Sequence, residues 1–206
     1  MSEATDISSG KREQTKLANR QAIMDAARAV FGEMGFEAAT VRDIIRRTSL
    51  SVGAFYNYYR SKEEIFVALA DDGARRFKPI LHALASEATD FESYLRAGVR
   101  AYFDFLKAEQ EVWRLNRPAG EAFGHIGNTP EILAVFEEVR SVFADAMERG
   151  LAPKVDLDYL AASCIAVARE IGDKMMERRP IDVEPAAEFV VRLILAGVSA
   201  LPRIEE

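Results

Sequence analysis

Hydrophobic residues near the start of the chain recur at helical spacing and stop at a glycine. Between residues 20 and 34 they fall at i, i+3, i+4 and i+7, which is typical of a helix with one buried face; they are Ile23, Ala26, Ala27, Val30, Phe31 and Met34. Gly35 then occupies the position at which many helices end. The polar residues 1–19 before this helix, rich in Ser, Thr, Lys and Glu, predict a disordered tail.

Two short helices around a tight turn are predicted within residues 40–66, TVRDIIRRTSLSVGAFYNYYRSKEEIF. Thr40 can cap the first helix, with Asp43 as its capping-box partner, and Ser51 can cap the second. Ser61 with Glu64 then opens a third helix. This succession is the layout of a helix-turn-helix DNA reader.

The side chains of the two short helices suit contact with DNA. The first helix buries an apolar edge and leaves three cations on its other sides, namely Arg42, Arg46 and Arg47. In isolation such a helix is usually a solvated face, but here the neighbouring helix changes that expectation. Val52 and Phe55 are expected to anchor the second helix, and the amide of Asn57 has the geometry for adenine. Tyr59 is expected to pack on a neighbouring helix.

From Arg20 to Phe66 the chain resembles the DNA-binding signature of the TetR family of bacterial transcriptional regulators. The one-sided helix, the glycine-aromatic stop and the threonine start all agree with that family. The resemblance implies an all-α protein, with an N-terminal three-helix helix-turn-helix DNA-binding domain over residues 20–66. It also implies a larger C-terminal helical domain for ligand binding and dimerisation over residues 67–206.

Carried over to this chain, the resemblance makes residues 51–58 the recognition helix. It implies phosphate contacts by Thr40, Tyr56, Tyr58 and Lys62, and base or sugar contacts by Arg42, Ser51, Val52, Gly53 and Asn57. Two positions depart from the family pattern, because many relatives have alanine at Ile45 and glycine at Ser49. The angle between the two short helices is therefore expected to differ slightly.

Charge is distributed unevenly along the chain. Residues 1–62 hold ten Lys or Arg against seven Asp or Glu, a net charge of +3, and the whole chain carries −6, which leaves −9 for residues 63–206. An acidic body is repelled by DNA unless the basic head faces the duplex. Binding is therefore expected to weaken steeply as salt increases.

The remainder of the chain is predicted to be helical, with helices starting near Thr89, Thr129, Asp156 and Pro185. The last two carry a wide apolar surface that needs a partner, with candidate interface residues Leu160, Cys164, Val167, Ile171, Phe189, Leu193, Ile194 and Gly197. The family resemblance implies a homodimer through a four-helix interface. Two symmetry-related readers would then bind a palindromic operator.

In similar proteins a small molecule binds inside the helical body. Aromatic and soft side chains of the central helices suit an apolar or aromatic effector; the candidate ligand-binding residues are Phe77, Tyr102, Phe103, Trp113, Phe123, His125, Phe143 and Arg169. Most of them also fit an ordinary core. Arg169 can instead pair with Asp173 four residues on, and His125 can be a solvated loop residue.

Catalytic, metal and cofactor sites are not expected. The chain has two histidines, His82 and His125, with no partner at metal-binding or catalytic spacing. The single cysteine, Cys164, is expected to be a buried structural thiol. No segment is typical of a signal peptide or a membrane-spanning helix, so a cytoplasmic location without membrane association is expected.

The sequence thus predicts a ligand-responsive, dimeric DNA-binding regulator, with a repressor that releases its operator on effector binding as the preferred form. An activator would use the same chemistry at a different operator position. A competing interpretation is a helical-bundle carrier of an apolar small molecule. A carrier explains the apolar body equally well but leaves the arginine-flanked helix pair without a role.

Overall fold

The computed structural model describes residues 3–109, 129–201 and 203, with side chains from Gly10 onward. All regular elements in these ranges are α-helices. The described residues form two compact units, which divide after Ala70. We call residues 3–70 the reader unit and residues 71–109 and 129–201 the body unit.

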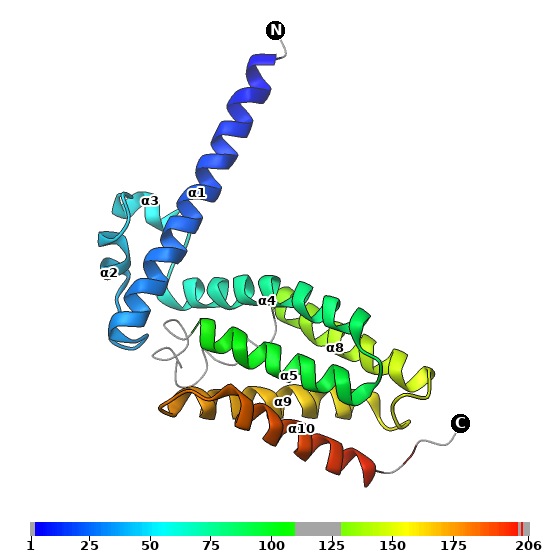
Figure 1. Cartoon of the computed structure of the whole chain (residues 1–206). Coiled ribbons are helices and arrows are strands. Elements are labelled where there is room, and N and C mark those ends of the chain that lie inside the picture. The colour runs from blue at the N-terminus through cyan, green and yellow to red at the C-terminus, as the bar shows by residue number, and fades with distance from the viewer. Residues whose placement is uncertain (1–2, 110–128, 202, 204–206) are drawn as a thin grey trace. The chain divides into compact units, whose positions relative to one another are not determined.

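The reader unit consists of three helices and the start of a fourth (Figure 1). They are α1 (Glu3–Met34), α2 (Val41–Arg46), α3 (Val52–Tyr56) and the first residues of α4 (Lys62–Glu87). Their core contains side chains with no solvent exposure from every one of these helices; these are Ile23, Ala27, Phe31, Ile44, Phe55 and Ile65. Gly35 ends α1 with a φ of 82°, a backbone conformation that glycine adopts without strain.

The start of α1 differs from the sequence prediction. Residues 1–19 were expected to be a disordered tail, whereas the helix already begins at Glu3 and continues without a break to Met34. Every residue from Gly10 to Ala18 is nevertheless exposed. This segment is therefore helical without packing against the rest of the reader unit, and Figure 1 shows it extending beyond α2 and α3.

The body unit contains the rest of α4 and four further helices. They are α5 (Phe91–Ala108), α8 (Pro130–Glu148), α9 (Leu157–Glu177) and α10 (Val183–Ser199). Helices α5, α9 and α10 contact one another in pairs, and α8 packs on α9. Phe103, Phe143 and Val190 lie fully inside this unit, and Phe91 stacks edge-on against Phe143 with 5.1 Å between ring centroids.

Helix starts in the body unit follow local capping signals. Thr129 and Asp156 cap α8 and α9 through their side chains, as predicted. The start of α5 is capped by Asp90 with Ser93 rather than by Thr89. α10 begins at Val183, so Pro185 lies within its first turn, where a missing N–H costs no hydrogen bond.

Among the helices in the described ranges, none is both long and apolar enough to cross a membrane.

Candidate nucleic-acid interface

Local capping positions α2. The side chain of Thr40 accepts a hydrogen bond from the backbone N–H of Asp43, and the carboxylate of Asp43 accepts one from the backbone N–H of Thr40. This is the capping box that the sequence predicted. The hydrogen bonds from Thr40 lower the pKa of the Asp43 carboxyl, which therefore stays charged at neutral pH. The start of α2 is thus fixed by four neighbouring residues of sequence.

Helix α3 is short and presents most of its surface to solvent. Ser51 caps it by accepting a hydrogen bond from the N–H of Ala54, 3.2 Å away, and Asn57 follows its last residue. The predicted recognition helix extended to Tyr58, so the observed helix is shorter. Five of the predicted DNA-contacting residues in and beside α3 are exposed, and they are separated by the half-buried Ala54 and the buried Phe55; the exposed ones are Ser51, Val52, Gly53, Tyr56 and Asn57.

Phe55 anchors α3 in the core with no solvent exposure, as expected. The expectation that Val52 also anchors the inner side is wrong, because Val52 is 58% exposed. With only one turn and a half of helix, the single position at Phe55 is enough to face the core. Val52 therefore lies on the outer face together with Tyr56, which is 51% exposed.

The three arginines of the α2 region have different partners. The guanidinium of Arg47 pairs with the carboxylate of Glu33 on α1 through both of its terminal nitrogens, and this contact lowers the pKa of Glu33. Arg46 lies 3.7 Å from Asp43. Arg42 is exposed and has no ion pair within the described part of the chain. Arg42 is therefore the cation of this group that is available to an anionic ligand.

Two side chains of α1, whose role no sequence pattern indicated, position the tyrosines that follow α3. The amide of Asn19 donates a hydrogen bond to the hydroxyl of Tyr58 at 3.0 Å. Arg20 donates one to the hydroxyl of Tyr59 at 3.0 Å and lies over its ring. Tyr59 is buried, as expected for packing on a neighbouring helix. The hydroxyl of Tyr58 keeps its own proton for a further acceptor.

Lys62, which was predicted to contact phosphate, has a structural role in the reader unit. Its ammonium group donates to the carbonyl oxygens of Phe36, Glu37 and Ala39 at 2.8, 3.1 and 3.2 Å, and it lies over the ring of Phe36. An ammonium group has three donors, so all of them are used. A contact between Lys62 and phosphate would require it to give up at least one of these bonds.

The comparison with known proteins agrees with this geometry. The family model for bacterial regulatory proteins of the tetR family matches residues 23–69, which include the whole turn between α2 and α3. The transcriptional activator FasR of Mycolicibacterium smegmatis is 24% identical over 192 residues, covering 89% of this chain and 84% of FasR. The chain belongs to the TetR family of transcriptional regulators.

Two further relatives show how the likeness is distributed along this TetR family member. The transcriptional repressor AcnR of Corynebacterium glutamicum is 40% identical, but only over 63 residues, which is 31% of this chain and 34% of AcnR. The solved structure of FadR from Bacillus subtilis in complex with stearoyl-CoA has the same fold, with a TM-score of 0.73 and 17% identity over 86% of this chain and 98% of FadR. TetR regulators bind DNA and dimerise.

In this TetR family member the predicted ligand-binding residues occupy different environments. Phe103 is fully buried, and Phe77 packs against Tyr102 with 5.6 Å between ring centroids. Arg169 is exposed. Phe143 lies in the core of the body unit beside Phe91. The three remaining candidates fall outside the described residues, namely Trp113, Phe123 and His125.

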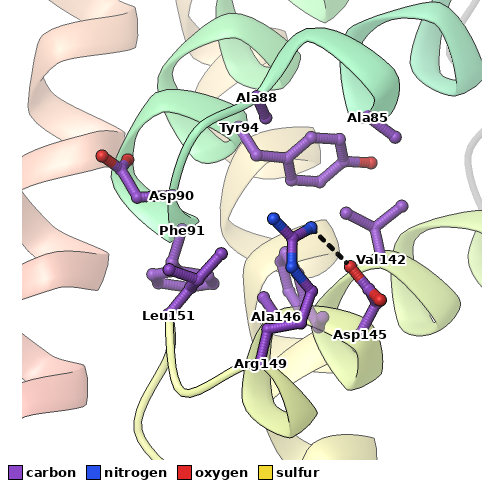
Figure 2. A pocket seen from close by; sticks show the side chains of 11 residues that line it. Ala85, Ala88, Asp90, Phe91, Tyr94, Val142, Asp145, Ala146, Arg149 and Leu151 are labelled. Carbon is purple, nitrogen blue, oxygen red and sulfur yellow. Dashed lines mark hydrogen bonds and ion pairs between the residues drawn. The ribbon is translucent and has the colours of Figure 1, made fainter.

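A small cavity lies between the end of α4, the start of α5 and α8 (Figure 2). Its volume is about 20 Å³, which has room for about one water molecule. Of the predicted ligand-binding residues only Phe143 lines it. The ion pair between Arg149 and Asp145, 3.0 Å long, borders it, as does Tyr94. This cavity is too small for an organic effector.

The predicted interface residues divide between the core and the surface of the body unit. Leu160, Cys164 and Ile194 are buried within the chain itself, so the expectation that they face a partner is wrong. α9 and α10 pack on α5 and on each other, and this packing uses the most apolar side of each helix. Val167 and Ile171 are half-buried on α9.

Three predicted interface residues of α10 are exposed, and they share one face. Phe189 and Leu193 are 56% and 50% exposed, and Gly197 follows them at helical spacing. α9 has a similar exposed stripe of aromatic and small side chains, formed by Tyr159, Ala162, Ser163 and Ala166. Each of the two helices therefore has a stripe of aromatic, apolar and small residues that is exposed in the described part of the chain.

Proposed function

We propose that this protein is a dimeric, sequence-specific DNA-binding regulator that releases its operator when an apolar small molecule binds the body unit. The observation that carries the proposal is the exposed face of α3. The side chains on this face do not pack in the core. The helix that carries them is nevertheless held in place by the cap at Ser51 and by the buried ring of Phe55. A helix that buries so little of itself is suited to enter the major groove.

The roles proposed for individual residues follow from their exposure. Arg42 and Asn57 can reach base edges, because a guanidinium pairs with guanine and an amide with adenine. Tyr56 and Tyr58 offer hydroxyl groups to phosphate oxygens, and Thr40 can do so when its hydroxyl gives up the hydrogen bond that it donates to Asp43. Such contacts fix the position of the reader without selecting a sequence. Ser51, Val52 and Gly53 form the leading end of α3, where small side chains allow close approach to bases or sugars.

The proposed dimer forms through the exposed stripes of α9 and α10. Small residues let helices of two chains approach closely, while Phe189 and Leu193 supply apolar area that is otherwise left in water. A two-fold dimer places two copies of α3 on symmetry-related half-sites. The operator is therefore expected to be a palindrome.

The proposed dimer interface can be tested by introducing a single charged side chain into the stripe of α10. Leu193→Glu is expected to shift the protein from dimer to monomer in sedimentation velocity, because a buried unpaired carboxylate is costly. Leu133→Glu on α8 is the matched control, since Leu133 is similarly exposed at 45% but lies outside the two stripes. A Leu193→Glu protein that remained dimeric would rule out this interface.

For the effector we propose a molecule with an apolar or aromatic body. Rings of Phe77, Tyr102 and Phe105 gather in the body unit, with Phe77 to Phe105 at 5.4 Å. FadR of Bacillus subtilis, which has the same fold, was crystallised with stearoyl-CoA, so a long acyl chain is the first probe to choose. Effector and DNA binding are then expected to weaken each other by the same factor, of about 5- to 150-fold.

The decisive experiment is selection of random duplex DNA on the purified protein, followed by titration of the recovered sequence at several salt concentrations. A recovered palindrome with a steep salt slope supports the proposal. Stearoyl-CoA, stearate and a short-chain acyl-CoA are then added to separate the contributions of chain and head group. If no sequence is enriched from protein that has been stripped of bound small molecules, the proposed function is wrong.

A further inference from the structure

The first half of α1 has a form that the helix-turn-helix does not require. The helix begins at Glu3, but its first side-chain hydrogen bonds to the rest of the reader unit are those of Asn19 and Arg20. Residues 10–18 are all exposed, including Leu17 at 60%. The helix therefore carries an arm, residues 3–18, that projects from the reader unit (Figure 1).

One face of this arm is basic. Arg12, Lys16, Asn19 and Arg20 follow one another at i, i+4, i+7 and i+8, so they lie along a single side of the helix. Between residues 10 and 20 the chain has four cations and one acid, Glu13. Arg12 and Lys16 make no ion pair within the described residues. They form a free positive stripe.

The orientation of this stripe is set by the contacts at its base. Asn19 and Arg20 reach the hydroxyls of Tyr58 and Tyr59, directly after α3. Because Arg12 and Lys16 share the face of these two residues, the stripe runs outward from Tyr58 and Tyr59, which follow α3. The stripe is therefore continuous with the proposed DNA-contacting surface.

We propose that Arg12 and Lys16 bind DNA phosphates outside the half-site that α3 occupies. This inference rests on the proposed function and adds a second contact region to it. From Arg20 to Arg12 the helix rises about 12 Å, at about 1.5 Å per residue. DNA carries a charge on each strand about every 3.4 Å of its axis, so this length spans about three or four base pairs. Phosphate contacts of this kind add affinity without sequence preference.

The test compares two double variants with the same loss of charge. Arg12→Ala with Lys16→Ala removes the stripe, and Lys107→Ala with Arg178→Ala removes two exposed cations from the body unit. Each protein is titrated at several salt concentrations against two operators. One ends at the half-sites, and the other extends about ten base pairs beyond them, which is one turn of DNA.

On the extended operator, the slope of log affinity against log salt is expected to be less steep for the arm variant than for wild type, by up to about 3.6. Each dimer loses four phosphate contacts, and each contact contributes about 0.9 to that slope. Its affinity is expected to fall at least about tenfold at low salt. On the trimmed operator the arm variant and wild type should agree, and the body variant should match wild type on both. Thermal unfolding checks that the exposed substitutions leave the fold intact.

Equal salt slopes for wild type and the arm variant on the extended operator would overturn the inference, and the arm would then be a solvated helix. Failure of the proposed function gives a different result, because then selection recovers no operator at all. In that case the same slopes are measured on a random duplex. A lower slope for the arm variant there would still support phosphate binding, and equal slopes would reject it.

Discussion

The reader unit and the body unit use aromatic side chains in opposite ways. Around α3, Tyr56 stands half exposed while local caps and Phe55 hold the backbone beneath it. In the body unit, Phe103 and Phe143 are buried, and they hold the helices together. The proposed DNA-contacting residues are thus not needed for the packing of the reader unit. A binding site for an apolar molecule, in contrast, must use the same kinds of residue as the hydrophobic core.

This difference explains why the sequence indicates candidate binding residues more clearly in the reader unit than in the body unit. Polar and small residues that are placed by a capping box have few structural tasks of their own, so their presence indicates contact with a partner. An apolar residue at helical spacing satisfies the core and a pocket equally well. Truncating matched residues in the two units is therefore the direct way to test the contrast.

The largest effect is expected from shortening one aromatic side chain in each unit. Phe103→Ala should lower the free energy of unfolding by about 3–5 kcal/mol, because it empties a fully buried position. Tyr56→Ala should change it by less than about 0.5 kcal/mol, since that ring is half exposed, while operator affinity falls. Urea titration and DNA titration measure the two quantities. The contrast fails if Tyr56→Ala destabilises the protein as much as Phe103→Ala does.

A smaller effect, of opposite sign in the two units, is expected from glycine substitution. A Cβ on Gly172 would lie 2.7 Å from Leu106 and 3.1 Å from Phe103, two buried side chains of α5, so Gly172→Ala should cost about 1–2 kcal/mol of stability. A Cβ on Gly53 meets nothing within 4 Å, and Gly53→Ala should stabilise α3 by up to about 1 kcal/mol.

Gly53→Ala should at the same time weaken operator binding, since the added methyl group occupies the surface that approaches DNA. Thermal unfolding and titration with operator are measured on the same preparation. If Gly53→Ala bound DNA as well as wild type did, Gly53 would have no close contact with the duplex, and its exposure would be incidental.

Lys62→Ala distinguishes a structural from a DNA-binding role within the reader unit. The loss of three hydrogen bonds from its ammonium group should lower stability by about 1.5–3 kcal/mol. The salt slope of DNA binding should stay the same, because the donors are already used. Arg60→Ala, which removes an exposed neighbouring cation, is the control for stability. A slope reduced by about 0.9 per protomer would instead support the predicted phosphate contact.

The smallest effect concerns the thiol of Cys164. Burial raises its pKa to about 12, whereas an unfolded cysteine titrates near 8.5. The neutral thiol therefore favours the folded state below about pH 8.5, and this contribution is lost as pH rises toward 12. At pH 8 iodoacetamide should label the folded protein at least about 100-fold more slowly than the urea-unfolded protein. Rapid labelling of the folded protein would show that the thiol is accessible, and Cys164→Ala is the blank.

Local sequence was sufficient for the elements of the reader unit. The cap at Thr40, the cap at Ser51 and the glycine stop at Gly35 all appear where the pattern predicts them. Each depends on residues within four positions, so no distant contact is needed to place it. The same holds for Thr129 and Asp156 in the body unit. The polar residues 3–19 were misjudged, because low hydrophobicity argues against packing and does not argue against an extended helix. The end of α3 and the burial of Val52 were also predicted wrongly.

Long-range packing decided the remaining features. Lys62 donates hydrogen bonds to carbonyl groups 23 to 26 residues earlier in the chain, and Asn19 donates one to Tyr58, 39 residues later. Patterns of neighbouring residues cannot predict such pairs. Likewise, helical spacing gives α9 and α10 wide apolar surfaces but cannot tell which side of each meets α5. The structure turns Cys164 and Ile194 inward and leaves Phe189 and Leu193 outward. Helix caps and hydrophobic periodicity depend on residues close together in the sequence. Which helix packs against each apolar face depends instead on how all the helices pack together in one core.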